Sequence, residues 1–396
     1  MFSVIMTQII KMLLILFVGI LVSRLHLIDD HANKALANLL LLVVNPIVAI
    51  TALQTDYSPD LVRGLLISYA LAILTHLVMI PVSTLLIRKP AEKPDAGQVL
   101  TSNNTQKGAS PENTREGVSS IRNESAVLSC EKAEDNCAVE RFAVIYSNCG
   151  FIGIPLVQSI LGSEGVLYLT AYMTVFNIFS WTHGLGLMTK NAAANEKRAN
   201  SHIHSPANDA KNSSASSSQE NPDHASNPQR TSAHAAGSFS ASARTLLHHL
   251  CTPMILASTL GLVLFFLQIK FPPILSDTLA YIGNMNTPLA MIIAGVSVSQ
   301  VNIPAMLRDP RIYLVSFGKL LLMPAIVFVI LLLVHVDSTV AYTILVAAAC
   351  PCAATGTAFA LKYHKNYAYS SELYAFSTLC SLITIPAFLY VAERLL

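Results

Sequence analysis

Long apolar stretches alternate with shorter polar ones along most of this chain. Windows of about 20 predominantly apolar residues, the length that crosses a bilayer as a helix, fall at roughly 4–23, 35–54, 62–87, 139–161 and 165–188, and again at roughly 246–268, 274–299, 311–334, 339–362 and 371–392. The pattern predicts an all-α membrane protein with ten transmembrane helices, five on each side of a central polar insert.

Two polar segments interrupt the apolar pattern. Residues 89–137 are rich in Gly, Ser and Glu, and residues 189–243 are rich in Ser, Ala, Asn and His with almost no large apolar side chains. Such segments cannot bury enough apolar surface to fold alone. The predicted organisation is spans one to three in 1–88, a polar cytoplasmic insert in 89–137, spans four and five in 138–188, a disordered cytoplasmic linker in 189–243, and spans six to ten in 244–396.

Span four contains a run of residues that disfavours a continuous helix. Asn148 is polar, Gly150 and Gly153 are poor helix formers, and Pro155 has no backbone N–H to donate; Cys149 lies among them. Irregular backbone at the depth of the bilayer persists only where it is buried in protein or lines a wet cavity. The run predicts a broken helix whose ends face a site inside the protein, and a proline-kinked structural helix is the alternative.

A second interruption lies at the matching place in span nine. The stretch 349–357 contains Pro351, Gly356 and the hydroxyls of Thr355 and Thr357. Paired broken helices in corresponding halves of a membrane protein indicate the substrate site of a secondary transporter. The positive N-terminal ends of such half-helices favour anions.

The two halves resemble each other in order. Asn45-Pro46 of span two corresponds to Asn286-Thr287-Pro288 of span seven, and Met79-Ile80-Pro81 of span three corresponds to Leu322-Met323-Pro324 of span eight. Because a repeat of five spans is odd, the second copy must enter the membrane upside down, which predicts an inverted repeat with spans four and nine as the broken crossover helices. Asn45 and Asn286 are candidate substrate-binding residues.

Composition predicts that most of the chain lies in a membrane, and the distribution of charge predicts its orientation there. The chain is 53% hydrophobic and 12% charged, against about 25% charged residues in soluble domains. Most of its 25 Lys and Arg residues fall in the odd-numbered connections, so these connections are predicted to be cytoplasmic. We therefore expect a multi-pass protein of the cell membrane with both termini outside the cytoplasm.

Two ionisable residues lie well inside predicted spans. Lys319 precedes Pro324 by as many residues as His76 precedes Pro81, so the repeat places them at equivalent points. Intramembrane ionisable residues are functional candidates, and a lysine without a buried carboxylate suggests a small organic anion as substrate. The alternatives are that Lys319 caps helix carbonyls or snorkels to the membrane interface, and that His76 is a neutral histidine of the core. His76 is the proton-coupling candidate; H⁺ or Na⁺ is the expected coupling ion.

Other classes of function have weaker support. Cys350-Pro351-Cys352 with Cys149 offers soft thiolate ligands, so transport of a soft metal is an alternative, although small packing residues explain the thiols better. A passive facilitator or channel for anions is a second alternative. We find no buried nucleophile–base pair, and we expect no enzymatic activity, no catalytic residues, no cofactor, no resident metal and no nucleic-acid partner.

The ordered set of motifs resembles the auxin efflux carrier family, which includes plant PIN proteins and bacterial malate or malonate permeases. The matching residues are Asn45-Pro46, 148–155, 287–291 with Gly295, 377–379 and 384–386. The resemblance implies a ten-helix fold, a scaffold of spans one, two, six and seven, and a transport unit of the remaining spans that moves as an elevator. It also implies a homodimer and a mono- or dicarboxylate substrate. The long 89–137 insert departs from the family's short connection.

Overall fold

The computed structural model describes residues 2–88, 135–189 and 252–395. Nearly all of the two polar inserts, and with them the predicted disorder of 189–243, lie outside the described residues. The helices before the second gap are α1 (Phe2–Arg24), α2 (Asp30–Leu39), η1 (Leu40–Val44), α3 (Asn45–Ala52), α4 (Pro59–Leu86), a helical stretch over 135–145, η2 (Cys149–Gly153), α6 (Ile154–Phe179), η3 (Ser180–Gly184) and α7 (Leu185–Thr189).

The helices after the second gap likewise include a short π-helical turn, labelled η, within a longer helix. They are α10 (Pro253–Phe266), α11 (Pro273–Asn284), α12 (Asn286–Ser299), α13 (Ile303–Arg308), α14 (Pro310–Phe317), η4 (Gly318–Leu322), α15 (Met323–Val334), α16 (Ser338–Ala349), α17 (Ala354–Lys362) and α18 (Tyr367–Leu395). Side-chain oxygens begin several of them: Thr252 accepts from the N–H of Ile255 and Asp337 from that of Thr339, as expected at helix N-termini.

Seven helices in the described part are long and apolar enough to cross a membrane: Ser3–Arg24, Asp30–Ala52, Pro59–Leu86, Cys149–Thr189, Pro273–Ser299, Pro310–Val334 and Tyr367–Leu395. Two shorter apolar helices, α10 and α16, join them. The prediction of an all-α membrane protein is confirmed. The long segment Cys149–Thr189 reverses at Gly162, whose φ of 68° is open to glycine at no steric cost. The structure shows interruptions in predicted spans four and nine and a reversal between spans four and five at Gly162, but the total of ten spans and their inverted relation stay predictions.

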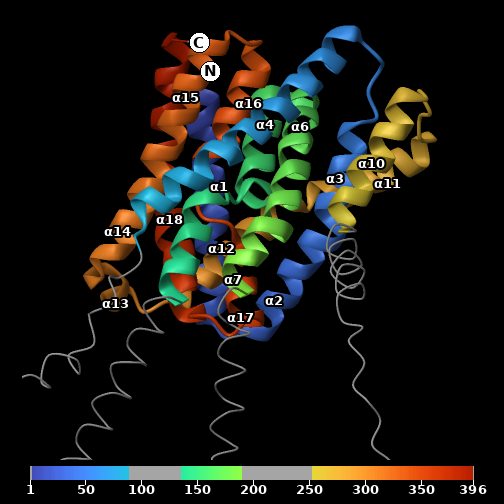
Figure 1. Cartoon of the computed structure of the whole chain (residues 1–396). Coiled ribbons are helices and arrows are strands. Elements are labelled where there is room, and N and C mark those ends of the chain that lie inside the picture. Colours follow the sequence, from blue (N-terminus) through green and yellow to red (C-terminus); the bar gives the residue numbers. More distant parts are fainter. Residues whose placement is uncertain (1, 89–134, 190–251, 396) are drawn as a thin grey trace, which may run out of the picture.

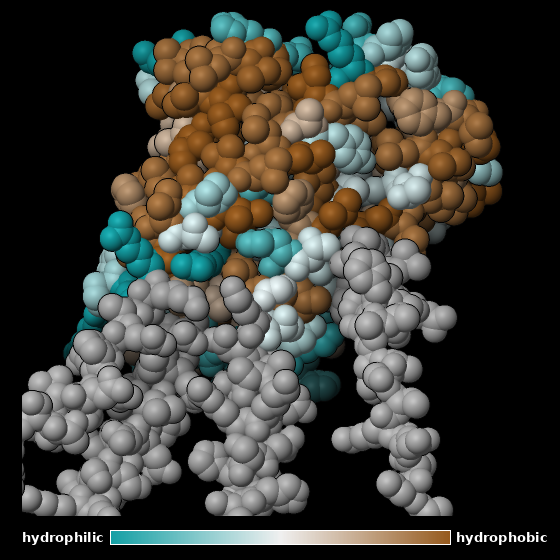
Figure 2. All heavy atoms as spheres, in the orientation of Figure 1, coloured by the Kyte–Doolittle hydropathy of each residue, from teal (hydrophilic) through white to brown (hydrophobic). Residues whose placement is uncertain are grey.

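Both ends of the chain lie at one end of the molecule, and α2, α13 and α17 lie at the other (Figure 1). Figure 2 shows a broad apolar surface over much of one face, with hydrophilic side chains at both ends. This distribution fits a bilayer around the middle of the helices.

The tightest helix contact joins α1 to α12. A Cβ atom on Gly19 would lie 2.5 Å from the carbonyl oxygen of Ile292, and one on Gly295 would meet the backbone of α1. Small residues allow this backbone-to-backbone approach, which drives helix association in membranes. In contrast, α16 is buried over almost its whole length and packs against α6, α15 and α4. The interruption at its end therefore lies at the centre of the protein.

Candidate functional site

Two stretches of non-helical backbone meet at the centre of the molecule. The helical stretch over 135–145 ends before Tyr146, and α16 ends at Ala349. An antiparallel bridge joins Ser147 to Cys352: the N–H of Asn148 donates to the carbonyl of Pro351 at 2.8 Å, and the N–H of Ala353 donates to that of Tyr146 at 3.0 Å. Each interruption thus satisfies backbone groups of the other, which buried polar backbone requires.

The residues after each interruption re-enter helices. Gly153 ends η2, which continues without a break into α6, where Pro155 is the second residue. A Cβ on Gly153 would lie 3.3 Å from the Cβ of Cys149 and 3.4 Å from the Sγ of Cys350. The small residues singled out in the sequence therefore permit close packing between the two interruptions.

Asn45 and Asn286 meet beside the first interruption. The Nδ2 of Asn286 donates to the Oδ1 of Asn45 at 2.6 Å and approaches the carbonyl of Gly150 at 3.4 Å. Both asparagines are buried, and Asn45 Nδ2 would lie 2.8 Å from a Cβ on Gly150. The structure thus brings together three candidate residues that lie far apart in the sequence.

Lys319 lies between the two interruptions and is fully buried in η4. Its Nζ donates to the Oγ of Ser147 at 2.5 Å and approaches the carbonyl of Ala348 at 3.4 Å. These acceptors belong to the C-terminal ends of the first half-helices, where a positive charge is favourable. The contacts of Lys319 are those of a capping residue, and its side chain does not line the large cavity described below.

His76, on α4, occupies an aromatic enclosure beside the first interruption, with its ring centroid 6.0 Å from that of Tyr146. Its Nδ1 lies 2.8 Å from the carbonyl of Ala72, and its ring faces those of Phe179 and Tyr172 at centroid distances of 5.1 and 5.4 Å. The Nδ1 proton must donate to this carbonyl, while Nε2 has no hydrogen-bond partner in the described chain. A neutral ring satisfies this geometry.

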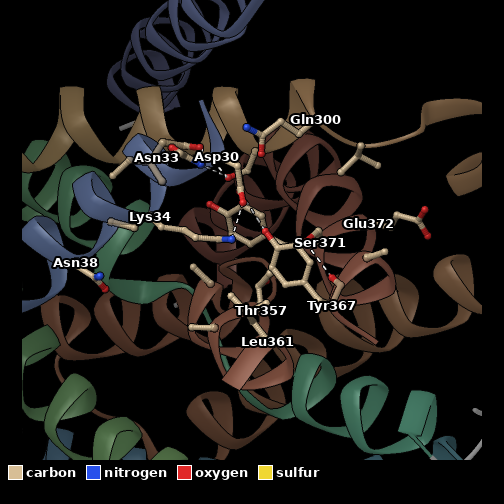
Figure 3. Close-up of a pocket in the computed structure, with 18 of the residues that line it drawn as sticks. Asp30, Asn33, Lys34, Asn38, Gln300, Thr357, Leu361, Tyr367, Ser371 and Glu372 are labelled. Carbon is tan, nitrogen blue, oxygen red and sulfur yellow. Dashed lines mark hydrogen bonds and ion pairs between the residues drawn. The ribbon is translucent and has the colours of Figure 1, made fainter. Parts of the chain in front are cut away.

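A cavity of about 750 Å³ opens between α2, α12, α17 and α18 and reaches the interruptions at Phe151 and Ala354. Figure 3 shows its polar residues: Lys34 extends from α2 toward Asp30 and the ring of Tyr367 on α18. The Lys34 Nζ lies 2.5 Å from the Oδ2 of Asp30 and 5.1 Å from the centre of the Tyr367 ring, and the Tyr367 hydroxyl lies 3.3 Å from Asp30 Oδ1. These contacts connect α2 to α18 across the cavity.

Several buried polar groups around the inner end of the cavity make no hydrogen bond of good geometry in the described chain. They are the Nδ2 of Asn148 and the hydroxyls of Thr355, Thr357, Tyr374 and Thr378. Tyr374 and Thr357 line the cavity, and the Tyr374 hydroxyl is close enough to the side chains of Asn148 and Thr378 to share hydrogen bonds with them. Unpaired buried donors are costly, and a ligand with acceptor oxygens would satisfy them.

The three thiols considered as ligands for a soft metal, those of Cys149, Cys350 and Cys352, are buried around Lys319. Among the residues that the structure describes, no group of three or more His, Cys, Asp or Glu side chains is placed to hold a metal ion. The observed surroundings of Cys149, Cys350 and Cys352 are those of close-packed side chains.

Ser147, Tyr374 and Thr378 were not among the predicted site residues, although Thr378 belongs to the 377–379 motif, because a single hydroxyl in an apolar segment does not by itself indicate a binding role. The predictions also missed a polar cluster around the buried Glu140 at the α13 end: the half-exposed Arg311 donates to both oxygens of Glu140 at 3.0 Å, and Tyr369 donates to Glu140 at 2.9 Å. This cluster joins the helical stretch over 135–145 to α14 and α18.

Apolar helices of spanning length, with a cavity that reaches two paired interruptions, define a multi-pass membrane protein with an internal cavity. A family model described as "Membrane transport protein" matches residues 119–389, more than half of the chain. The chain therefore belongs to the auxin efflux carrier family of membrane transport proteins. This is a family of transporters and not of enzymes. No curated protein matches the chain.

Proposed function

We propose that this protein is a secondary active transporter that moves small organic anions, mono- or dicarboxylates, across the cell membrane by an elevator mechanism. The observation that carries the proposal is the group of buried amide and hydroxyl side chains at the inner end of the cavity: Thr357 and Tyr374 line it, and Asn148, at the first interruption, lies beside Tyr374. An amide and two hydroxyls there match the oxygens of a carboxylate.

Charge supports an anion over a cation at this place. The N-termini of α17 and of η2 with α6 follow the interruptions, and the first N–H groups of a helix have no partner within it. Lys319 adds a buried positive charge behind them. Of the two carboxylates that line the cavity, Asp30 lies in the first turn of α2 and is paired with Lys34, and Glu372 is the sixth residue of α18. The inner end of the cavity thus lacks a negative charge among its lining residues.

The ten-span inverted repeat is part of the same proposal. Asn45 and Asn286 occupy corresponding places after η1 and α11 and contact each other. The tight α1–α12 contact suits a rigid scaffold, and the bridge between the interruptions suits a transport unit that moves as one body. The proposed orientation places the termini outside the cytoplasm and the large cavity open to the cytoplasm; a homodimer follows from the family resemblance.

Coupling to H⁺ would use His76, whose Nε2 is free to accept a proton, and coupling to Na⁺ would use carbonyl and hydroxyl oxygens instead. Transport by His76→Gln, measured against pH, separates the two. A pH profile identical to that of the unmodified protein would remove His76 from the coupling.

The experiment that tests the proposed function is uptake and counterflow of labelled malate, malonate, pyruvate and lactate in proteoliposomes. Thr357→Val removes one cavity hydroxyl, and Thr278→Val is its matched control, because Thr278 is exposed on α11 and bonds only to its own helix. Thr357→Val should weaken carboxylate affinity by about fivefold, the value of one hydrogen bond, and the control should not. Absence of carboxylate exchange would reject the anion proposal; transport without counterflow would favour a passive facilitator.

A further inference from the structure

A second, smaller crevice of about 270 Å³ lies between α1 and α6. Its lining residues are Ser3, Val4, Thr7, Gln8, Lys11 and Ser159, five of which are polar. The crevice lies near the start of α1 and just before the reversal at Gly162. It is therefore near the end of the molecule where both termini lie, opposite the large cavity (Figure 1).

The polar residues of α1 gather on one part of the helix. Ser3, Thr7 and Lys11 are spaced four residues apart, so they lie above one another on the same face. Farther along, this face continues with Leu14 and Val18, which are exposed apolar residues. Only the outer half of the face is polar, which lipid alone does not explain, because polar residues in spanning helices face the protein interior or water.

Lys11 is exposed, and in the part of the chain that the structure describes it makes no hydrogen bond or ion pair. No carboxylate lines the crevice around it. An ammonium group, hydroxyls and an amide that converge without a negative partner are suited to an oxyanion.

We propose that the crevice between α1 and α6 is an outer subsite for a carboxylate anion, with Lys11 as its counter-charge. The inference rests on the proposed function. The crevice would receive the anion at the face opposite the large cavity, and it lies beside α6, the helix that continues from η2 at the first interruption. The competing occupant is the phosphate of an anionic lipid headgroup.

Thiol labelling in proteoliposomes tests the proposal without requiring transport. Thr7→Cys places a thiol in the crevice, Ile10→Cys places one on the exposed apolar side of α1 as a matched control, and the unmodified protein gives the background of the native cysteines. A membrane-impermeant thiol reagent should label Thr7→Cys at least about tenfold faster than Ile10→Cys, since the thiolate that reacts exists in water and not in lipid. Malate should slow the labelling of Thr7→Cys. Adding Lys11→Gln should raise the malate concentration required by about fivefold.

Three outcomes would overturn the subsite. The first is equal labelling of Thr7→Cys and Ile10→Cys, and the second is protection by malate that Lys11→Gln leaves unchanged. The third is protection by phosphatidylglycerol and not by malate, which would assign the crevice to lipid. Counterflow measured on the same vesicles keeps the two proposals apart. Malate counterflow without Lys11-dependent protection rejects only the subsite, whereas Lys11-dependent protection without counterflow supports the subsite and rejects carboxylate transport.

Discussion

The contact between Lys319 and Ser147 permits a quantitative test of how the two interruptions are held together. Lys319 is fully buried, and its nearest acceptor is the Ser147 hydroxyl at 2.5 Å; the Ala348 carbonyl is more distant at 3.4 Å. Ser147→Ala would leave the ammonium group with the weaker contact alone. Loss of a hydrogen bond to a charged group costs roughly 1.5–3 kcal/mol, and we expect the free energy of unfolding to fall by this amount.

Removal of the charge should reverse most of that loss. Lys319→Met keeps the length of the side chain but needs no acceptor, and replacing a buried charge with an apolar side chain of similar volume is often neutral. The double variant Ser147→Ala/Lys319→Met should therefore be more stable than Ser147→Ala, with a coupling energy of about 1–3 kcal/mol.

The assay is thermal unfolding in detergent, followed by the loss of the monodisperse peak in size-exclusion chromatography. Ser68→Ala is the control, because Ser68 is also buried but bonds only to the Gly64 carbonyl of its own helix at 2.8 Å. Equal melting temperatures for Ser147→Ala and Ser68→Ala would refute the capping role, as would a double variant that is destabilised by the sum of the two single effects.

Two other predictions follow from close contacts. Asn286→Ala should raise the KM for malate about tenfold, because it leaves the Oδ1 of Asn45 unpaired beside the interruption; counterflow kinetics measure this, and an unchanged KM would separate the asparagine pair from substrate binding. Gly19→Val should destabilise the protein by about 1–3 kcal/mol, because its Cβ would meet the Ile292 carbonyl at 2.5 Å. Gly186→Ala, with no atom within 4 Å of the added Cβ, should leave the melting temperature unchanged; equal effects of the two substitutions would contradict the packing argument.

The sequence predicted the helical membrane class because long apolar windows leave few alternatives once backbone groups must bond internally. It also located the irregular backbone: Asn148 and Pro351, chosen as poor helix residues, are hydrogen-bonded to each other across the bridge. Asn45 and Asn286, chosen as repeat partners, are in contact. Local composition is sufficient to locate these residues, because each motif is written in consecutive residues, whereas the contacts between the motifs required the structure.

Features that depend on distant parts of the chain could not be predicted. The acceptor of Lys319 on Ser147 and the cavity position of Tyr374 both require knowledge of how helices pack. The π-helical turn η4, which carries Lys319, leaves no mark in the hydropathy pattern.

The bridge between the interruptions also has a consequence for biosynthesis. The N–H of Asn148 and the carbonyl of Pro351 are separated by more than half of the chain, so the first interruption must wait for its partner while the ribosome translates the intervening residues. At the usual rate of synthesis this delay is on the order of 10 s. During that time the backbone around Asn148 has no protein partner at its final position, and hydrocarbon cannot supply one. The insertion machinery would therefore have to hold this segment in a hydrated place until the second half arrives, and a truncated chain that ends before Pro351 should be a target for membrane quality control.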